Sequence, residues 1–280
     1  MVKIVTDSNS GITPAMAQQL GIVGNGASYV NFGDKSYKDT IEISSDQFYE
    51  MLRTIPELPK TSAPSVGDFE SIYSRLKGEE VVSIHLSRAL SGTIQAAETA
   101  AGMMNGDPRV TVVDTRSINV GQTLLVLEAL EMAQAGRTAA EIKSQIESLV
   151  PRMRVNLVLE TLDNLKRGGR ISNTSAFIGS VLQMKPILTV LDGKVAPLER
   201  VRTHAKAIAR LKEIAMQDLA GQTNPKVAFL HTNALAAAEA FKKDLSAQLN
   251  LKYDALLLEA GPAVAVHVGP GALGLAYIVK

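Results

Sequence analysis

Hydroxyl side chains and a glycine gather at two places in this 280-residue sequence, in patterns that suit the binding of an anion. Thr61 and Ser62 are adjacent hydroxyls just ahead of a proline, and Ser91, Gly92 and Thr93 follow an apolar, strand-like segment and open a helical one. Hydroxyls donate hydrogen bonds, and glycine lets an anion approach the backbone amides of a helix N-terminus. The same residue types also favour plain turns and helix caps, which is the alternative interpretation at both places.

Two further residues have chemistry suited to a carboxylate or phosphate. Arg170 ends the basic run at residues 166–170, and a guanidinium group binds such anions with two parallel hydrogen bonds. A solvated basic turn is the alternative there, since most surface charges are simply hydrated. His267 lies in an apolar stretch at residues 263–268, where it either donates to an anionic group or is a buried core imidazole, the commoner fate of a lone histidine.

Several kinds of chemistry are excluded by what the sequence lacks. There is no cysteine, hence no disulfide, thiolate ligand or cysteine nucleophile. The histidines do not have metal-binding spacing; they are His85, His204, His231 and His267. Residues 269–274 match the G-x-G-x-x-G pattern, but only six residues follow, too few for a dinucleotide-binding βαβ unit. No phosphate-binding loop or serine nucleophile elbow occurs, so we expect no metal and no cofactor.

Composition indicates a soluble protein with a small-molecule or protein partner. The 29 basic and 28 acidic residues nearly cancel, which argues against nucleic acid or an anionic membrane as the main partner. No apolar run approaches the roughly 20 residues of a membrane span, so we expect a cytoplasmic protein without stable membrane insertion.

Short apolar segments alternate with helical ones through the first half of the chain. Strand-like residues 2–6, 81–84 and 110–113 each precede a helical pattern, which predicts a mostly parallel sheet covered by helices. After Pro151 the pattern changes, because Asp192 and Gly193 form a tight turn between two further strands. With 46% hydrophobic residues the chain is long enough for two domains. We predict two α/β domains, a three-layer domain at 1–154 and one with a mixed sheet at 155–280, with the ligand in the cleft between them.

Seven motifs in this order resemble the DegV family and span nearly the whole chain. They lie at residues 7–8, 30–34, 61–65 (TSAPS), 90–93 (LSGT), 165–171 (LKRGGRI), 185–188 (KPIL) and 267–274 (HVGPGALG). The resemblance implies a fatty-acid-binding protein of two α/β domains with the ligand between them. Several members carry the acyl chain for a separate fatty-acid kinase, which supplies ATP and catalysis while the bound carboxylate becomes an acyl phosphate.

The resemblance also assigns residues. The carboxylate of a long-chain fatty acid is expected to contact Thr61, Ser62, Ser91, Gly92, Thr93 and His267, and Arg170 is expected at the pocket mouth or the kinase contact. Family members often have Gln where this chain has Ala63, so a contact made by that side chain is missing here.

Two other functions compete with this carrier. A hydrolase or acyltransferase would use Ser91 or Ser62 as nucleophile and His267 as base, oriented by Asp7 or Asp114. A regulatory sensor that responds to bound lipid would share the same pocket. The apolar stretch at residues 176–184 is either tunnel wall or plain core.

Overall fold

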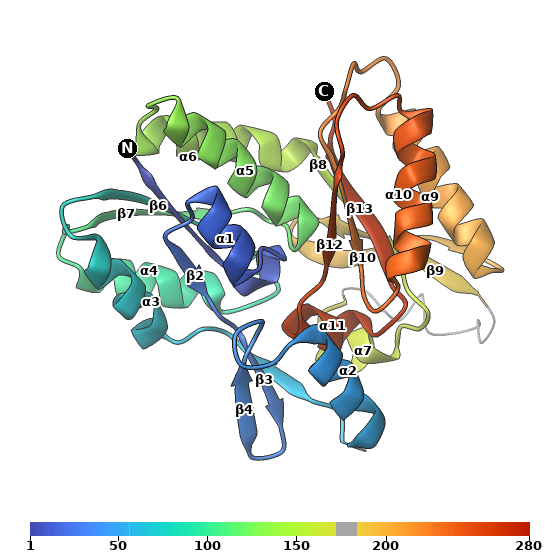
Figure 1. Ribbon diagram of the computed structural model, residues 1–280, viewed down its shortest axis with the longest axis horizontal. Coiled ribbons are helices and arrows are strands. Elements are labelled where there is room, and N and C mark those ends of the chain that lie inside the picture. Colours follow the sequence, from blue (N-terminus) through green and yellow to red (C-terminus); the bar gives the residue numbers. More distant parts are fainter. Residues whose placement is uncertain (56, 172–183) are drawn as a thin grey trace.

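The computed structural model describes residues 1–55, 57–171 and 184–280 (Figure 1). Its N-terminal sheet has the order β2-β1-β6-β7 and every pairing in it is parallel. The strands are β1 (Lys3–Asp7), β2 (Gly24–Gly26), β6 (Glu80–His85) and β7 (Arg109–Asp114). Neighbouring residues of β1 point to opposite faces, Ile4 into one core cluster and Val5 into another, which explains the nearly continuous apolar run.

Helices cover both faces of this sheet, which confirms the predicted three-layer arrangement. One layer contains α1 (Pro14–Leu20), α5 (Val120–Gln134) and α6 (Ala139–Leu149), and the other α3 (Val66–Tyr73) and α4 (Thr93–Met103). The helices begin where local signals place them, because Thr13, Ser65 and Thr138 each accept a hydrogen bond from a first-turn amide. Short 3₁₀ turns occur at Ser8–Ser10, Ser74–Leu76 and Val150–Arg152.

A small antiparallel sheet interrupts the βα pattern, and the sequence analysis did not predict it. It has the order β4-β3-β5, with β3 (Tyr29–Phe32), β4 (Lys35–Lys38) and β5 (Lys60–Ser62), and it is accompanied by α2 (Ser45–Thr54). Val30 and Phe48 of this unit pack against Ala263 and Ala265, from α11 (Pro262–Val268) near the end of the chain. The unit therefore reaches over to the C-terminal half and holds β5 beside α11.

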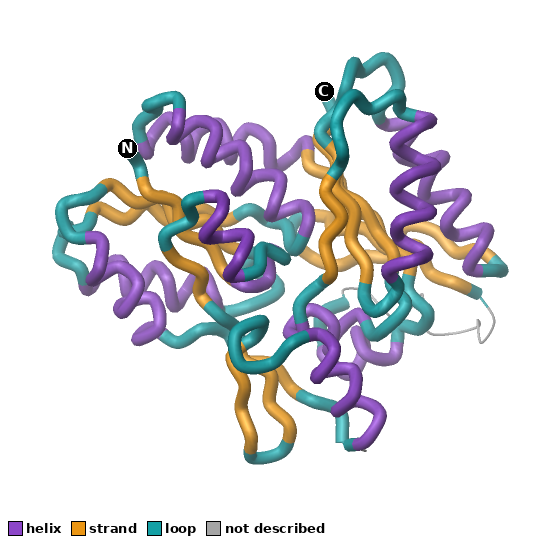
Figure 2. The backbone as a smooth tube through the Cα atoms, in the orientation of Figure 1, coloured by secondary structure: helices purple, strands orange, loops and turns teal. Residues whose placement is uncertain are grey.

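The C-terminal sheet is mixed, as predicted, with the order β10-β9-β8-β13-β11-β12. The strands are β8 (Met153–Val158), β9 (Lys185–Leu191), β10 (Lys194–Val201), β11 (Val227–His231), β12 (Leu256–Glu259) and β13 (Leu273–Ile278). Only β11 and β12 pair in parallel among these described strands. The helices α9 (His204–Asp218) and α10 (Leu235–Gln248) cover one face, and α7 (Asp163–Gly168) follows β8 (Figure 2).

The predicted tight turn between β9 and β10 is confirmed and also joins the two halves. Asp192 and Gly193 have φ angles of 49° and 76°, values that suit a two-residue hairpin turn. A Cβ atom on Gly193 would lie 2.3 Å from the Oγ atom of Ser87, so the turn packs directly on the N-terminal half. Glycine is thus required here both for its backbone conformation and for this close approach.

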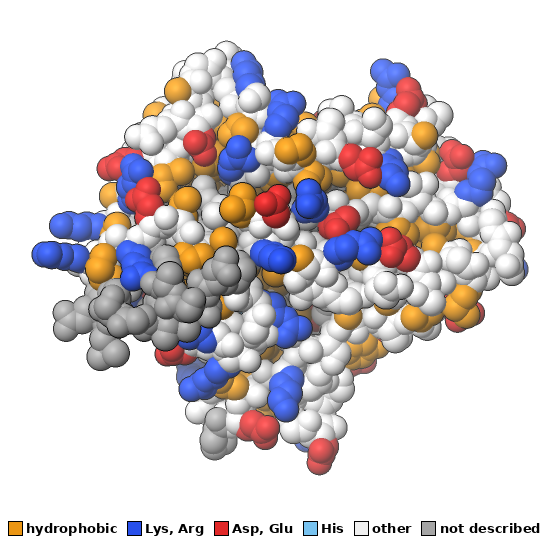
Figure 3. Space-filling view, turned by 180° about the vertical axis from the view of Figure 1, so that it is seen from behind, with side chains coloured by type: hydrophobic (Ala, Val, Ile, Leu, Met, Phe, Trp, Pro, Cys, Tyr) orange, Lys and Arg blue, Asp and Glu red, His pale blue; other side chains and the backbone are white. Residues whose placement is uncertain are grey.

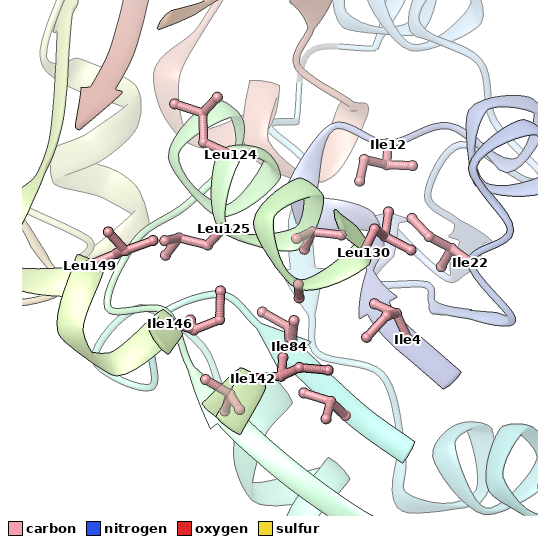
Figure 4. Packing of buried hydrophobic residues seen from close by; sticks show 14 of the residues in the cluster. Ile4, Ile12, Ile22, Ile84, Leu124, Leu125, Leu130, Ile142, Ile146 and Leu149 are labelled. Atoms are coloured by element: carbon pink, nitrogen blue, oxygen red, sulfur yellow. The ribbon is translucent and has the colours of Figure 1, made fainter. Parts of the chain in front are cut away.

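Helix α5 lies between the two large sheets and gives them a shared core. Figure 4 shows Leu124, Leu125 and Leu130 of this helix among the buried isoleucines of the N-terminal half. The buried residues Leu124 and Leu125 belong to one cluster that also includes Ile4 of β1 and Ala276 of β13. A helix that is apolar on nearly all sides is expected to be buried in this way. A boundary at 154/155 cuts through β8, so we propose that the first domain ends just before Met153.

The surface bears charges of both signs. Lys and Arg side chains alternate with Asp and Glu on the face in Figure 3. No helix in the described ranges has the length and apolar character needed to cross a bilayer.

Candidate functional site

A pocket of about 950 Å³, part of it open to solvent, lies between the two halves of the molecule. Its N-terminal wall consists of residues that follow the carboxyl ends of parallel strands: Asn9 after β1, Leu86 after β6 and Ile118 after β7. Ligands of open α/β sheets bind in this crevice, at the point where the strand order reverses, here between β1 and β6. The pocket therefore lies where small-molecule sites of such sheets are usually found.

The opposite wall is apolar and comes from one face of the mixed sheet. Val155 and Leu157 of β8, Val190 of β9 and Val195 of β10 line it, together with Leu230 of β11. Residues two apart on a strand share a face, which explains why alternate positions of β8 reach the pocket. This wall offers an alkyl chain a surface with no hydrogen-bonding side chains.

The polar end of the pocket brings together most of the residues predicted to bind an anion. Thr61, Ser62, Ser91, Gly92, Arg170 and His267 all line it. The closest contact joins Thr61 Oγ1 and His267 Nε2, which lie 2.9 Å apart although the residues are 206 positions apart in the chain. Either atom can be the donor, depending on the tautomer of the imidazole. The small sheet that carries β5 makes this contact possible.

The Ser62 hydroxyl keeps a proton available for a ligand, whereas the Ser91 hydroxyl shares a contact with Thr93 in which either atom can be the donor. Ser62 Oγ accepts a hydrogen bond of 2.9 Å from the Nδ2 atom of Asn31, which leaves its own O–H free to donate. Ser91 Oγ accepts from the amide of Thr93 at 3.3 Å and lies 2.9 Å from the Thr93 Oγ1 atom. Thr93 itself is fully buried and does not line the pocket, so it contacts Ser91 rather than the cavity.

The two glycines of the basic motif have distinct structural roles. Gly169 adopts a φ angle of 66° and caps the end of α7. A Cβ atom on Gly168 would lie 2.4 Å from the Nδ1 atom of His267, so only glycine leaves room for the imidazole. The next residue, Arg170, donates from Nη1 to the Gly168 carbonyl at 2.5 Å. Its guanidinium group is thereby held at the pocket, with no carboxylate within ion-pair distance among the described residues.

His267 is a neutral imidazole at physiological pH. Burial, and to a lesser degree the positive charge of Arg170, lowers the pKa of His267 to about 4. Its Nδ1 atom is buried and has no hydrogen-bond partner in the part of the chain that the structure describes. An anion placed between His267 and Arg170 would favour the protonated imidazole.

Three polar residues of the pocket were missed by the sequence analysis: Asn9, Ser28 and Asn119. Asn9 follows the Asp7-Ser8 motif, and its Nδ2 atom donates to Ser28 Oγ at 2.9 Å. The position of Asn9 just after the first parallel strand was the available signal. Asn119 has a φ angle of 49°, which nothing in the surrounding sequence indicates.

A second histidine cluster lies outside the pocket and involves Asp7. The His85 Nδ1 atom lies 3.0 Å from Asp7 Oδ2, and His85 Nε2 lies 2.7 Å from Ser83 Oγ. The order Asp-His-Ser resembles a catalytic triad, but all three side chains are buried, and none lines the described pocket. This cluster therefore lacks access to a substrate.

The geometry at His267 does not match the hydrolase interpretation. Asp7 contacts His85 instead, and Asp114 accepts from the backbone amide of Arg116 at 2.8 Å. No carboxylate among the described residues contacts His267, which leaves the imidazole without the orienting group that a triad requires. A pKa near 4 also makes His267 a weak general base at neutral pH.

Two other questions concern parts of the chain away from this pocket. The apolar stretch at residues 176–184 lies outside the described residues except for Met184, so its role as tunnel wall or core stays open. In the described ranges, no group of three or more His, Asp or Glu side chains is arranged to hold a metal ion.

Comparisons with known proteins cover the whole chain. A family model described as an uncharacterised protein of the DegV family matches residues 1–280. A DegV domain-containing protein of Halalkalibacterium halodurans is 35% identical, with 100% of this chain and 99% of that protein covered. Protein DegV of Bacillus subtilis is 32% identical, with the same coverage.

Solved structures of two relatives have the same fold. A DegV family protein from Thermus thermophilus, described for its fatty acid binding, has a TM-score of 0.92 and 33% identity, covering 100% of this chain and 99% of that one. DegV from Bacillus subtilis, described as a fatty acid binding protein, has a TM-score of 0.88 and 31% identity with the same coverage. With a family model that matches from the first residue to the last and relatives above 30% identity along their whole length, this chain belongs to the DegV family.

Proposed function

We propose that this protein binds a long-chain fatty acid and presents its carboxylate to a separate ATP-dependent fatty-acid kinase, which forms the acyl phosphate. The observation that carries the proposal is the polarity of the pocket, which has an apolar sheet face along one wall and hydroxyl, imidazole and guanidinium groups at one end. Two relatives with more than 30% identity are described as fatty acid binding, which supports the same ligand class here.

In this proposal the carboxylate lies between Thr61, Ser62 and Ser91, with the backbone at Gly92 and the His267 imidazole close by. Thr93 acts through Ser91, whose hydroxyl it contacts. Each hydrogen bond to a charged group contributes about 1.5–3 kcal/mol. These bonds determine where the carboxylate sits, and each contributes less to the affinity than the alkyl tail does.

The apolar wall supplies most of the affinity. Transfer of a methylene from water to an apolar site is worth about 0.8 kcal/mol, so a tail of about 16 carbons represents about 12 kcal/mol before the costs of association. The tail would run from the polar end along Leu157 towards Val155. Binding should therefore strengthen with chain length over the span that the wall covers.

Access to the carboxylate supports presentation to a partner. Ser62, Gly92 and Arg170 are exposed, so the polar end is the side of the pocket that solvent and another protein can reach. Arg170 is the residue we assign to the pocket mouth or the kinase contact. Because the kinase uses ATP, the proposal also locates the protein in the cytoplasm.

Native mass spectrometry of the purified protein, followed by denaturation and lipid identification, tests the binding step. A stoichiometric fatty acid is the expected result. A protein that is empty and takes up neither added palmitate nor oleate would contradict the proposal.

The presentation step needs a separate assay. The loaded protein is mixed with a purified bacterial fatty-acid kinase and ATP, and acyl phosphate is trapped with hydroxylamine. Formation of acyl hydroxamate only when all three components are present is expected. A loaded protein that gives none with any kinase tested, but changes its partner binding with lipid, would favour the lipid-responsive sensor instead.

A further inference from the structure

A second cavity lies behind the apolar end of the pocket, and we call it the distal chamber. It contains about 560 Å³, part of it open to solvent, and its apolar residues are Val150, Pro151, Met153 and Leu191. These residues lie at the start of β8 and the end of β9, away from α7 and the polar end. The chamber is thus placed beyond the point where a bound tail would end.

Two valines separate the chamber from the pocket. Val155 and Val190 line both cavities, so they lie at the junction between them. Asn156 of β8 pairs with Thr189 of β9 in antiparallel register. Val155, one residue before Asn156, and Val190, one residue after Thr189, therefore lie opposite each other on the same face of the sheet. The opposite wall is also continuous, since the segment from Arg116 to Asn119 contributes residues to both cavities.

Gly121 of α5 determines how deep the valine barrier sits. A Cβ atom on Gly121 would lie 2.4 Å from Val155 Cγ2 and 2.2 Å from Ser117 Oγ. The absence of a side chain there lets Val155 lie back against the helix instead of further into the pocket. The position of the barrier is therefore built into the contact between α5 and β8.

The chamber also contains groups that an incoming chain would contact. Leu191 is 62% exposed, and it is one of the large apolar side chains that the described surface leaves in water. Contact with an alkyl chain would remove part of that surface from water. Arg116, Arg154 and Asp192 also line the chamber, so added methylene groups would gain binding energy where they contact its apolar residues.

We propose that Val155 and Val190 form the end-stop of the acyl pocket and set the longest fatty acid that the protein binds well, with the distal chamber as the space that opens when the stop is shortened. This inference rests on the proposed function. It adds the residues that determine chain-length specificity and the direction in which the tail points.

The test measures binding of saturated fatty acids of about 12 to about 24 carbons by displacement of a fluorescent fatty acid, since each buried methylene should strengthen binding about fourfold until the stop is reached. The wild type is compared with V190A, V155A and V190F. Val190 is only partly buried, so V190A is expected to fold normally, and thermal unfolding checks each variant. L198A is the matched control, because Leu198 is 42% exposed and lines neither cavity.

We expect a length limit in the wild type, a limit at least two carbons longer in V190A or V155A, a shorter one in V190F, and no change in L198A. The same limit in the wild type and in both alanine variants would overturn the end-stop while leaving fatty-acid binding intact. A wild type that binds no fatty acid of any length would instead overturn the proposed function.

Discussion

Two histidines of this chain contact hydroxyl groups, but their surroundings differ in how completely the hydrogen bonds are satisfied. His85 is fully buried, and both ring nitrogens have partners, Asp7 on one side and Ser83 on the other. Ser83 in turn lies 2.8 Å from the hydroxyl of Tyr73. His267 has Thr61 on one side and nothing on the other within the described structure.

The difference distinguishes a structural cluster from a binding site. A saturated buried network stabilises one arrangement of the strands and has no capacity left for a ligand. A buried polar atom without a partner costs free energy, and it persists where a ligand or another function compensates. Gly168 keeps the His267 Nδ1 atom without a protein partner, because any side chain at position 168 would fill the space beside the imidazole.

Removal of the Asp7 carboxylate should have the largest effect on stability. It accepts hydrogen bonds from the Asn9 amide, the Leu86 amide and Gln122, at 3.0, 3.1 and 3.0 Å. Asp7→Ala leaves these donors and His85 buried without their partner, which should lower the free energy of unfolding by about 3–5 kcal/mol. Urea denaturation followed by circular dichroism measures the change.

The control for this prediction is Glu147→Ala. Glu147 is exposed, and Lys143, at 3.8 Å, is its one ion-pair partner in the described part of the chain, so its loss should cost less than about 1 kcal/mol. Equal stability of the two variants would mean that the Asp7 cluster does not anchor the fold.

His267→Leu should show the opposite pattern, a large loss of affinity without a loss of stability. Leucine has about the size of histidine but cannot donate a hydrogen bond to the carboxylate. The loss of that one bond corresponds to about 10- to 150-fold weaker palmitate binding. Stability should stay the same or rise slightly, because a buried unpartnered nitrogen is removed. Isothermal titration with palmitate and with hexadecanol separates the roles: a similar loss for the alcohol would show that the imidazole only shapes the cavity.

Asp39→Asn should raise stability in a pH-dependent manner. Asp39 is fully buried, its Oδ1 atom accepts from the Ala263 amide of α11 at 3.1 Å, and burial raises its pKa to about 6. A carboxyl whose pKa is raised by folding contributes stability below its unfolded value, and this is lost as the pH rises through 6. The variant should exceed the wild type by about 1–3 kcal/mol at pH 8 and by about half as much at pH 5.

Urea denaturation of both proteins at the two pH values measures this difference. An equal gain at both pH values would show that packing, and not the buried charge, explains the effect.

Local signals in the sequence predicted more of the fold than of the site. Capping at Thr13 and Thr138 and the turn at Gly193 depend on residues a few positions apart, so they could be found from the sequence alone. The small antiparallel sheet and the central position of α5 could not, because they depend on packing between distant segments. In the site, family resemblance indicated Thr61 and His267. The role of Asn119 and the need for glycine at position 168, beside the His267 imidazole, could be recognised only in the folded structure.

The affinity for fatty acid should depend on pH through His267. In the empty protein, burial lowers the pKa of His267 to about 4. The contribution of the neutral imidazole to the free energy of unfolding is therefore present above the unfolded pKa of about 6.5 and is lost as the pH falls through 4. A bound carboxylate raises that pKa again, because an opposite charge favours the imidazolium. The complex then binds a proton more readily than the empty protein does, and affinity must increase as the pH falls.

Palmitate affinity should therefore be a few-fold higher at pH 6 than at pH 8, measured at concentrations low enough that palmitate stays monomeric and its own carboxyl group stays ionised. The measurement belongs in the Asp39→Asn background, because Asp39 titrates in the same window and caps the helix that carries His267. Addition of His267→Leu should abolish the slope. If the slope is unchanged without the imidazole, the proton is taken up elsewhere and the contrast between the two histidines does not extend to ligand binding.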